Sequence, residues 1–399
     1  MTTIITAADA ADFLALIPRL AGFHPSHSVV LVPFDGSRTL GALRVDLPDD
    51  AMEVDRVAAT LTGMVCRVGD ADGVAIVVYT DHPLVASDGA MAYAGFVDAL
   101  KGRADACGLR VVDALCVAGD AWGSYLRADA AAHPRPLADL REAHALDAVP
   151  ADLPSPTGDQ SAGAELPTKD LAQRETAARA LRALGDAVDA VCTATGTEEA
   201  ARSDLAALDP QALAAACALD DVPALFEDAL EWDAGELRPF DAAAMIWCLS
   251  RPALRDIALV QWCGDIGVGD DALRAQLRWE RGDDFPEHLA AYLWGDADRP
   301  DARRLRAALD LVRHCAALTP RASRPGPLAA AGWLSWALGR STHAHRYAAE
   351  ALAIDPEHGL GGIVSSMVAA AHLPEWAFDT DPGSPAQTRP GPARASEAS

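Results

Sequence analysis

The spacing of hydrophobic residues changes several times along the first third of the chain. Apolar positions three and four residues apart predict amphipathic helices over 8–21, 52–66 and 88–106. Pro18 is expected to end or kink the first helix near Ile17, because proline cannot donate the backbone hydrogen bond of a helix interior. Runs rich in β-branched residues predict strands over 28–34, 39–47, 73–79, 109–117 and, at an edge, 122–127.

These strands are expected to form one mixed sheet. The first two flank the turn Asp35-Gly36, which favours an antiparallel hairpin. Residues 73–79 are apolar on both faces, as in a strand covered from two sides. The helix between this strand and 109–117 implies a right-handed parallel crossover. We therefore predict an α/β domain over residues 1–148, with a mixed sheet of about five strands and helices packed on it.

Beyond residue 168 the strand signals disappear and helical spacing remains. Helices are predicted over 171–191, 241–249, 254–262, 301–317, 328–338, 342–354 and 360–371. We therefore predict an all-α helical domain over 169–378. Two segments rich in Pro, Gly, Ser and Ala cannot bury much apolar surface, so we interpret 149–168 as a linker or mobile loop and 379–399 as a disordered tail.

The last helices of this domain carry a weak repeat signal. The order Gly339, Ala344, Tyr347, Asp355-Pro356 resembles the second half of a tetratricopeptide repeat, in which small residues let paired helices approach closely. The first half of that repeat matches poorly. The pattern predicts a helical hairpin, and a groove for a protein or peptide partner is a further hypothesis, with Trp333, Trp336 and Tyr347 as candidate residues.

Charge excludes some partners. The chain has 33 Lys and Arg against 58 Asp and Glu, a formal net charge of −25. Such an acidic protein repels phosphate backbones and anionic lipids, so we expect neither nucleic acid nor membrane as a partner. No window approaches the roughly 20 apolar residues of a membrane span, and the N-terminus lacks the basic segment of a secretory signal. We expect a cytoplasmic location.

Cysteines and motifs indicate no metal or cofactor. The eight cysteines are scattered, without the two-residue spacing of zinc and thioredoxin-like sites, and we interpret them as free thiols that act as small core hydrophobes. Walker, nucleophile-elbow and His-Glu-x-x-His motifs are absent from the sequence. Residues 264–269 contain three glycines but follow a helix, so they predict a plain loop rather than a dinucleotide site.

Two loops of the first domain carry candidate functional residues. His24 and His27 lie between the first helix and the first strand, and histidine can act as acid, base or ligand near neutral pH. Asp81 and His82 follow the strand 73–79, and open α/β sheets bind ligands outside the carboxyl ends of their strands. Turn and capping roles are the alternative for both loops.

A third pair of candidates lies in the second strand of the predicted hairpin. Arg44 and Asp46 share the polar face of this strand, because they are two residues apart. They either pair with each other on a solvated face or line the same crevice as the two loops.

Several stretches distributed over most of the chain carry a family resemblance: 16–25, 28–32, 43–48, Trp122 with Ser124-Tyr125-Leu126, Arg255-Asp256 and the helices from Trp333 to Pro356. They resemble an actinobacterial family known as DUF4192, a domain of unknown function. Family members often carry cysteines just after the segment that matches Ser124-Tyr125-Leu126, whereas residues 127–133 here contain none. The resemblance implies a cytosolic actinobacterial protein and no particular activity.

The sequence thus supports two main hypotheses of function, beside the weaker one of a purely structural scaffold without a small ligand. The first is a ligand-sensing or protein-interaction module without its own catalysis. The alternative is an enzyme of unrecognised class that uses His24, His27, Asp81 and His82 around the sheet crevice. An enzyme requires these side chains to converge at one site, whereas a module does not.

Overall fold

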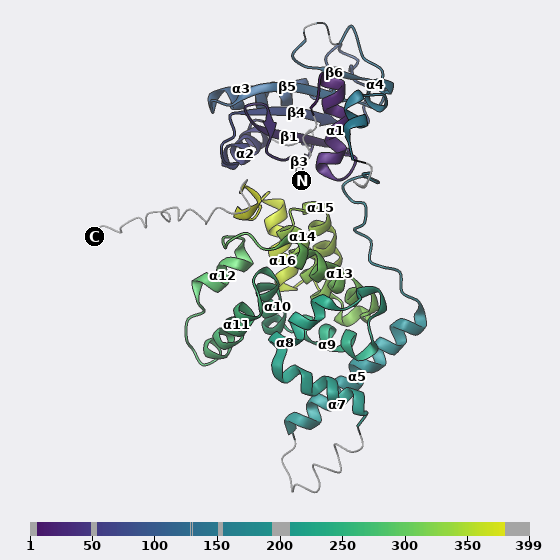
Figure 1. Ribbon diagram of the computed structural model, residues 1–399, viewed down its shortest axis with the longest axis vertical. Coiled ribbons are helices and arrows are strands. Elements are labelled where there is room, and N and C mark those ends of the chain that lie inside the picture. The colour runs from purple at the N-terminus through teal and green to yellow at the C-terminus, as the bar shows by residue number, and fades with distance from the viewer. Residues whose placement is uncertain are drawn as a thin grey trace, which may run out of the picture. The chain divides into compact units, whose positions relative to one another are not determined.

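The polypeptide folds as two compact units that divide between Ala162 and Gly163 (Figure 1). The structure, a computed structural model, describes residues 6–48, 54–127, 129, 131–150, 155–193 and 208–379.

The first unit contains a six-stranded mixed sheet, which confirms the predicted α/β class. Its elements are α1 (Ala10–Ala21), β1 (Ser28–Asp35), β2 (Arg38–Thr39), β3 (Leu43–Asp46), α2 (Val54–Arg67), β4 (Gly73–Tyr79), α3 (Ala94–Ala106), β5 (Arg110–Val117), β6 (Trp122–Ser124) and α4 (Ala138–Arg141). The strand order is β2-β1-β4-β5-β6, and β3 also pairs with β1. Strands β4 and β5 are parallel, as the crossover predicted, and β1 is antiparallel to β2, β3 and β4.

Helices cover both faces of the sheet. On one face, Leu14 and Ile17 of α1 pack with Val30 and Val77 in a single core. On the other face, Leu31 and the neighbouring side chains contact α2 and α3, which also pack on each other (Figure 1). The alternation of β1 between these two cores explains why every residue of this strand except Asp35 is buried.

Two details of the helices in this unit differ from the prediction. Pro18 does not end α1, which continues to Ala21, the last residue of the predicted range, where Gly22 in the left-handed region closes it. Proline in the last turn costs only one hydrogen bond there, and burial of Ile17 outweighs that loss. Helix α3 begins at Ala94 rather than near residue 88, because residues 84–92 form a tight turn with an Ala86 N–H to Ala90 carbonyl bond.

The second unit is all helical in its described part, residues 163–193 and 208–379, as predicted. Its α-helices are α5 (Leu171–Thr193), α7 (Pro210–Ala218), α8 (Val222–Asp228), α9 (Pro239–Leu249), α10 (Pro252–Cys263), α11 (Ile266–Trp279), α12 (Glu287–Trp294), α13 (Ala302–Leu318), α14 (Pro325–Ala337), α15 (Ser341–Leu352) and α16 (Gly359–Ala369). Helices α7, α8, α11 and α12 were not predicted. The glycine-containing stretch 264–269, predicted as a loop, includes the first turn of α11.

The units divide inside the segment predicted as a linker, residues 149–168. The described residues of this segment form hydrogen bonds within the first unit before the division and within the second unit after it. Gly158 accepts from the His24 N–H in the first unit, and Arg313 donates to the carbonyls of Gly163 and Glu165 in the second. The domain limits at residues 148 and 168 stay predictions, and the predicted tail lies outside the described residues apart from Asp379.

The cysteines are free, but only half of them occupy the core. Cys116, Cys248, Cys263 and Cys315 are buried, whereas Cys66, Cys107, Cys192 and Cys217 are exposed. The prediction that the cysteines act as core hydrophobes was therefore wrong for four positions, because apolar sequence neighbours do not fix the side of a helix on which a residue lies.

No helix in the described part of the chain has the length and apolar character needed to cross a membrane.

Candidate functional site

Strand pairing brings the candidate loops to one edge of the sheet. In the antiparallel register of β1, Ser28 lies opposite Tyr79 of β4 and, on its other side, opposite Asp46 of β3. The beginning of β1 therefore meets the ends of β3 and β4. His27, which precedes β1, and Asp81 and His82, which follow β4, become neighbours although they are distant in sequence.

His27, Asp81 and His82 form a polar cluster at this edge. The His27 Nε2 atom lies 3.2 Å from Asp81 Oδ2, and both side chains are exposed, by 53% and 79%. The His82 ring meets the His27 ring edge-on with centroids 6.1 Å apart, and its other neighbour is Tyr93 at 6.4 Å. We call these four residues the histidine cluster.

The histidine cluster contributes little to stability. A contact this exposed between an imidazole and a carboxylate is worth about 0–1 kcal/mol. His27 also has a left-handed backbone conformation, with φ of 44°, which costs a residue with a side chain on the order of 1 kcal/mol. A strained residue in a weak exposed pair is a reason to look for a function.

Backbone hydrogen bonds hold the loop after β4 in place. Thr80 N–H donates to the Val117 carbonyl, Gly119 N–H donates to the His82 carbonyl, and Leu84 N–H donates to Asp120 Oδ1. A Cβ atom at Gly119 would lie 2.6 Å from the Asp81 carbonyl oxygen, so only glycine permits this approach. Gly119 and Asp120 were not among the predicted site residues, although a Gly-Asp pair directly after a strand is a signal that could have indicated them.

Arg44 and Asp46 pair with each other, one of the two alternatives for these residues, and Arg44 also contacts the start of β1. Arg44 donates from Nε to Ser28 Oγ at 2.7 Å and forms an ion pair with Asp46. Burial lowers the pKa of the Arg44 guanidinium from its ordinary value, while the carboxylates of Asp46 and Asp159 act in the opposite direction. Because Ser28 is fully buried, this pair positions the strand next to the histidine cluster rather than adding an open polar group.

His24 does not join the other candidates. Its side chain is exposed, and among the described residues no hydrogen bond, ion pair or ring contact of this side chain reaches the other five candidates. Its loop is held instead by Gln160, which accepts from the Ser26 N–H and donates to the Ser26 carbonyl. Gln160 was not among the predicted site residues, because it belongs to the segment interpreted as a linker.

The histidine cluster offers hydrogen bonding and proton transfer. The carboxylate of Asp81 accepts hydrogen bonds, and two imidazole rings can donate or accept them. Among the described residues, no three His, Cys, Asp or Glu side chains gather closely enough to hold a metal ion.

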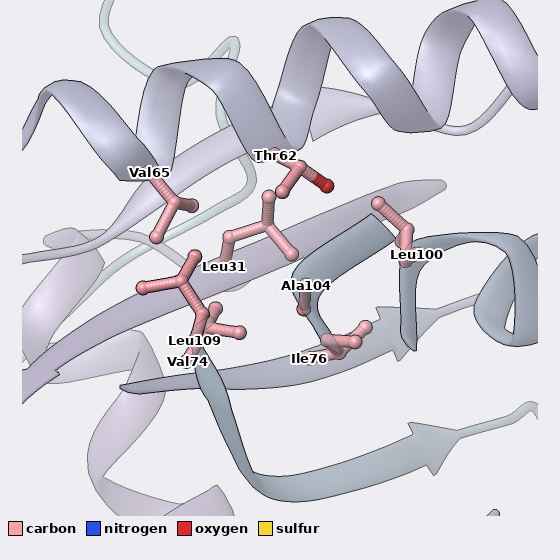
Figure 2. A pocket seen from close by; sticks show the side chains of 8 residues that line it. All are labelled: Leu31, Thr62, Val65, Val74, Ile76, Leu100, Ala104 and Leu109. Atoms are coloured by element: carbon pink, nitrogen blue, oxygen red, sulfur yellow. The ribbon is translucent and has the colours of Figure 1, made fainter. Parts of the chain in front are cut away.

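A small cavity in the same unit is not a ligand site. Figure 2 shows it between the sheet and helices α2 and α3, lined by Leu31, Thr62, Val65, Val74, Ile76, Leu100, Ala104 and Leu109. Its volume of about 10 Å³ is near the lower limit for one water molecule, and Thr62 supplies the only side-chain oxygen. The cavity is a packing gap on the face opposite α1.

The candidate groove residues of the last helices are buried. Trp333, Trp336 and Tyr347 are exposed by only 1%, 0% and 0%. The indole N–H groups of the two tryptophans donate to the Leu293 and His372 carbonyls within the unit. These aromatic rings belong to the helical core, where a partner cannot reach them.

Comparison with known proteins gives a family and no activity. No curated protein and no solved structure matches the chain. The helices from Trp333 to Pro356 lie beyond the residues that a family model matches. That model covers residues 11–292, which include the whole histidine cluster, and the chain belongs to the family it describes, domain of unknown function DUF4192.

Proposed function

We propose that the first unit is a sensing module that binds a small polar ligand at the histidine cluster, without catalysis of its own. The observation that carries the proposal is the meeting of His27, Asp81 and His82 at the carboxyl end of β4. This is the part of an open α/β sheet where ligands bind. Hydrogen bonds fix the loops on both sides, so the site is largely formed before a ligand arrives.

The chemistry of the cluster suggests the ligand class. Asp81 presents an exposed carboxylate, which favours an amine or hydroxyl donor on the ligand. The His82 and Tyr93 rings, tilted by 41° to each other, supply an apolar surface beside it. We infer a small ligand with a hydrogen-bond donor and a flat or apolar part.

A thermal-shift screen of polar metabolites tests this proposal. A ligand at 100 times its Kd stabilises the folded protein by about 2.7 kcal/mol, which is readily measured. We expect the shift to disappear in Asp81→Ala and to persist in His24→Ala, because no hydrogen bond, ion pair or ring contact joins the His24 side chain to the cluster. A shift that survives Asp81→Ala, or the absence of any hit, would overturn the proposal.

Proton-transfer catalysis is the second candidate function, and one observation favours it. Asp81 contacts Nε2 of His27, and a carboxylate on one ring nitrogen leaves the other to exchange a proton with a substrate. The hits of the screen should then be converted, which mass spectrometry of the incubated mixture detects. Conversion that is lost in His27→Gln would establish the enzyme in place of the sensing module.

For the helical unit we propose an interaction with an acidic partner at its surface. Arg306 and Arg313 lie two turns apart on α13, and both are near Arg340 at the start of α15. Burial, together with these two neighbouring guanidinium groups, lowers the pKa of Arg340 from its ordinary value. Arg306 and Arg340 have no carboxylate partner in the described residues, although the chain carries a net charge of −25. The tetratricopeptide-like interpretation of α14 and α15 is part of this proposal.

Binding of a glutamate-rich peptide tests the interaction. The double variant Arg306→Ala/Arg340→Ala should weaken binding at low salt by tenfold or more, on the order of 1.4 kcal/mol. Arg303→Ala is the control, because Arg303 is already paired with Asp301. Equal affinities of the double variant and the control would contradict this proposal.

A further inference from the structure

Two exposed cysteines lie at neighbouring helix ends in the first unit. Cys66 is in the last turn of α2, and Cys107 directly follows α3. Helices α2 and α3 pack against each other. Both thiols are exposed, although most cysteines in folded proteins are buried.

The cavity between these helices is lined by residues that lie near each cysteine in sequence. Val65, which precedes Cys66, lines the cavity of about 10 Å³ together with Ala104 and Leu109, which flank Cys107 (Figure 2). Residues on both sides of Cys107 thus share one water-sized space with the neighbour of Cys66. The Cys107 thiol is also close enough to contribute, after burial, to the raised pKa of the Cys66 thiol.

We propose that Cys66 and Cys107 are a redox modification site, at which a low-molecular-weight disulfide converts the two thiols reversibly into an intramolecular disulfide. The other two exposed cysteines, Cys192 and Cys217, lie in the helical unit. They serve as internal controls, because they are exposed thiols that do not belong to the proposed pair.

The reaction balances with the small disulfide as oxidant. One protein thiol loses a proton and attacks a sulfur of the small disulfide, whose S–S bond breaks and releases a small thiolate. The second protein thiol loses its proton and attacks the mixed disulfide, which forms the Cys66–Cys107 bond and releases the second small thiolate. The two released thiolates take up the two protons, and the two electrons from the protein sulfurs reduce the oxidant to two thiols.

The environment of Cys66 makes this reaction slow at neutral pH. The part of the Cys66 thiol that is shielded from water, and next the adjacent Cys107 thiol, raise the pKa of Cys66 above its ordinary value. Since the thiolate is the attacking species, oxidation should accelerate between pH 7 and pH 9. An exposed disulfide is also readily reduced again, which suits reversible modification in a reducing compartment.

The bond would tie the ends of α2 and α3 together. It joins positions 66 and 107 and so closes a long loop in the unfolded chain. We expect oxidation to raise the Tm of the first unit by about 5 °C or more, since long loops give the larger effects.

Peptide mapping of the full-length protein tests the proposal. The protein is incubated with oxidised glutathione at pH 8, alkylated without reduction and digested with trypsin. We expect the peptides 57–67 and 104–110 to be recovered as one disulfide-linked species, which dithiothreitol separates. Recovery of both peptides only as separate glutathione adducts would overturn the proposal.

Cysteine variants test whether the disulfide forms specifically between Cys66 and Cys107 or between any exposed thiols. Cys66→Ser and Cys107→Ser should each abolish the linked species and leave a glutathione adduct on the remaining cysteine. The double variant Cys192→Ser/Cys217→Ser should form the linked species at an unchanged rate. Linkage of Cys66 or Cys107 to Cys192 or Cys217 at comparable yield would also contradict the pairing.

Discussion

At the residue scale, Gly269 is important because the side chain of Gln261 lies directly against it. The fully buried side chain of Gln261 donates from Nε2 to the Pro223 carbonyl and to Glu227 Oε2. A Cβ atom at Gly269 would lie 2.0 Å from Gln261 Oε1. The glycine therefore permits α11 to approach α10, a contact that the glycine-containing sequence pattern does not reveal.

Gly269→Ala should destabilise the helical unit by about 1–3 kcal/mol, because the new methyl group displaces Gln261 from its buried hydrogen bonds. Gly362→Ala is the matched control. Apart from its chain neighbours and the backbone of its own helix, no atom lies within 4 Å of its Cβ position, so helix propensity should make it neutral or stabilising by up to about 1 kcal/mol. Urea unfolding measures both, and equal stabilities would show that the Gly269 contact is not tight.

His358 makes the stability of the helical unit depend on pH. Its Nδ1 atom accepts from the Gly361 N–H at the start of α16. Burial, and next the nearby Arg255, lowers the pKa of His358 below its ordinary value of 6.5, against the smaller opposing effects of Asp355 and Asp256. Folding thus favours the neutral imidazole, and this contribution is present above about pH 6.5 and is lost as the pH falls below that value.

The variant His358→Asn separates this effect from other titrating groups, because asparagine caps a helix without changing its charge. Between pH 7 and pH 5 the Tm of the variant should fall less than that of the wild type. Parallel pH profiles of the two proteins would exclude His358 as a contributor.

At the scale of elements, helices α14, α15 and α16 pack through small residues. Gly332 of α14 has its Cβ position 3.3 Å from the Ala344 carbonyl oxygen of α15, and Ala351 is fully buried. The spacing of alanines indicated this close approach. It did not indicate that α14 begins at Pro325, three residues before the predicted start, where Gly326 packs against the Leu249 carbonyl.

Ala351→Leu should cost about 1–3 kcal/mol, because three added carbon atoms overpack a contact without free space. Glu350→Ala should change stability by roughly half a kcal/mol or less, since it removes a half-exposed pair with Arg346. Thermal unfolding compares the two variants. Equal Tm values would show that Ala351 is not at a tight helix contact.

At the scale of the whole molecule, each unit has its own hydrophobic core. One core joins α1 to the sheet, and a separate core extends from α5 to α16. A unit with its own core is expected to fold alone.

Fragments 1–162 and 163–379 should therefore each unfold cooperatively, as measured by circular dichroism. A fragment that is soluble but shows no cooperative transition would demonstrate that the units depend on each other.

The sequence by itself determined the fold class and most elements of this protein. Hydrophobic periodicity is a local property, and it is strong in β4, which is apolar throughout, and in α13. Only the tertiary structure decided which polar residues meet. His27 contacts Asp81 because Ser28 pairs with Tyr79, whereas Trp333 and Trp336, expected at a groove, fill the helical core. The physical reason is that strand register and helix packing follow from how apolar faces combine over long sequence separations, and the local pattern does not specify these combinations.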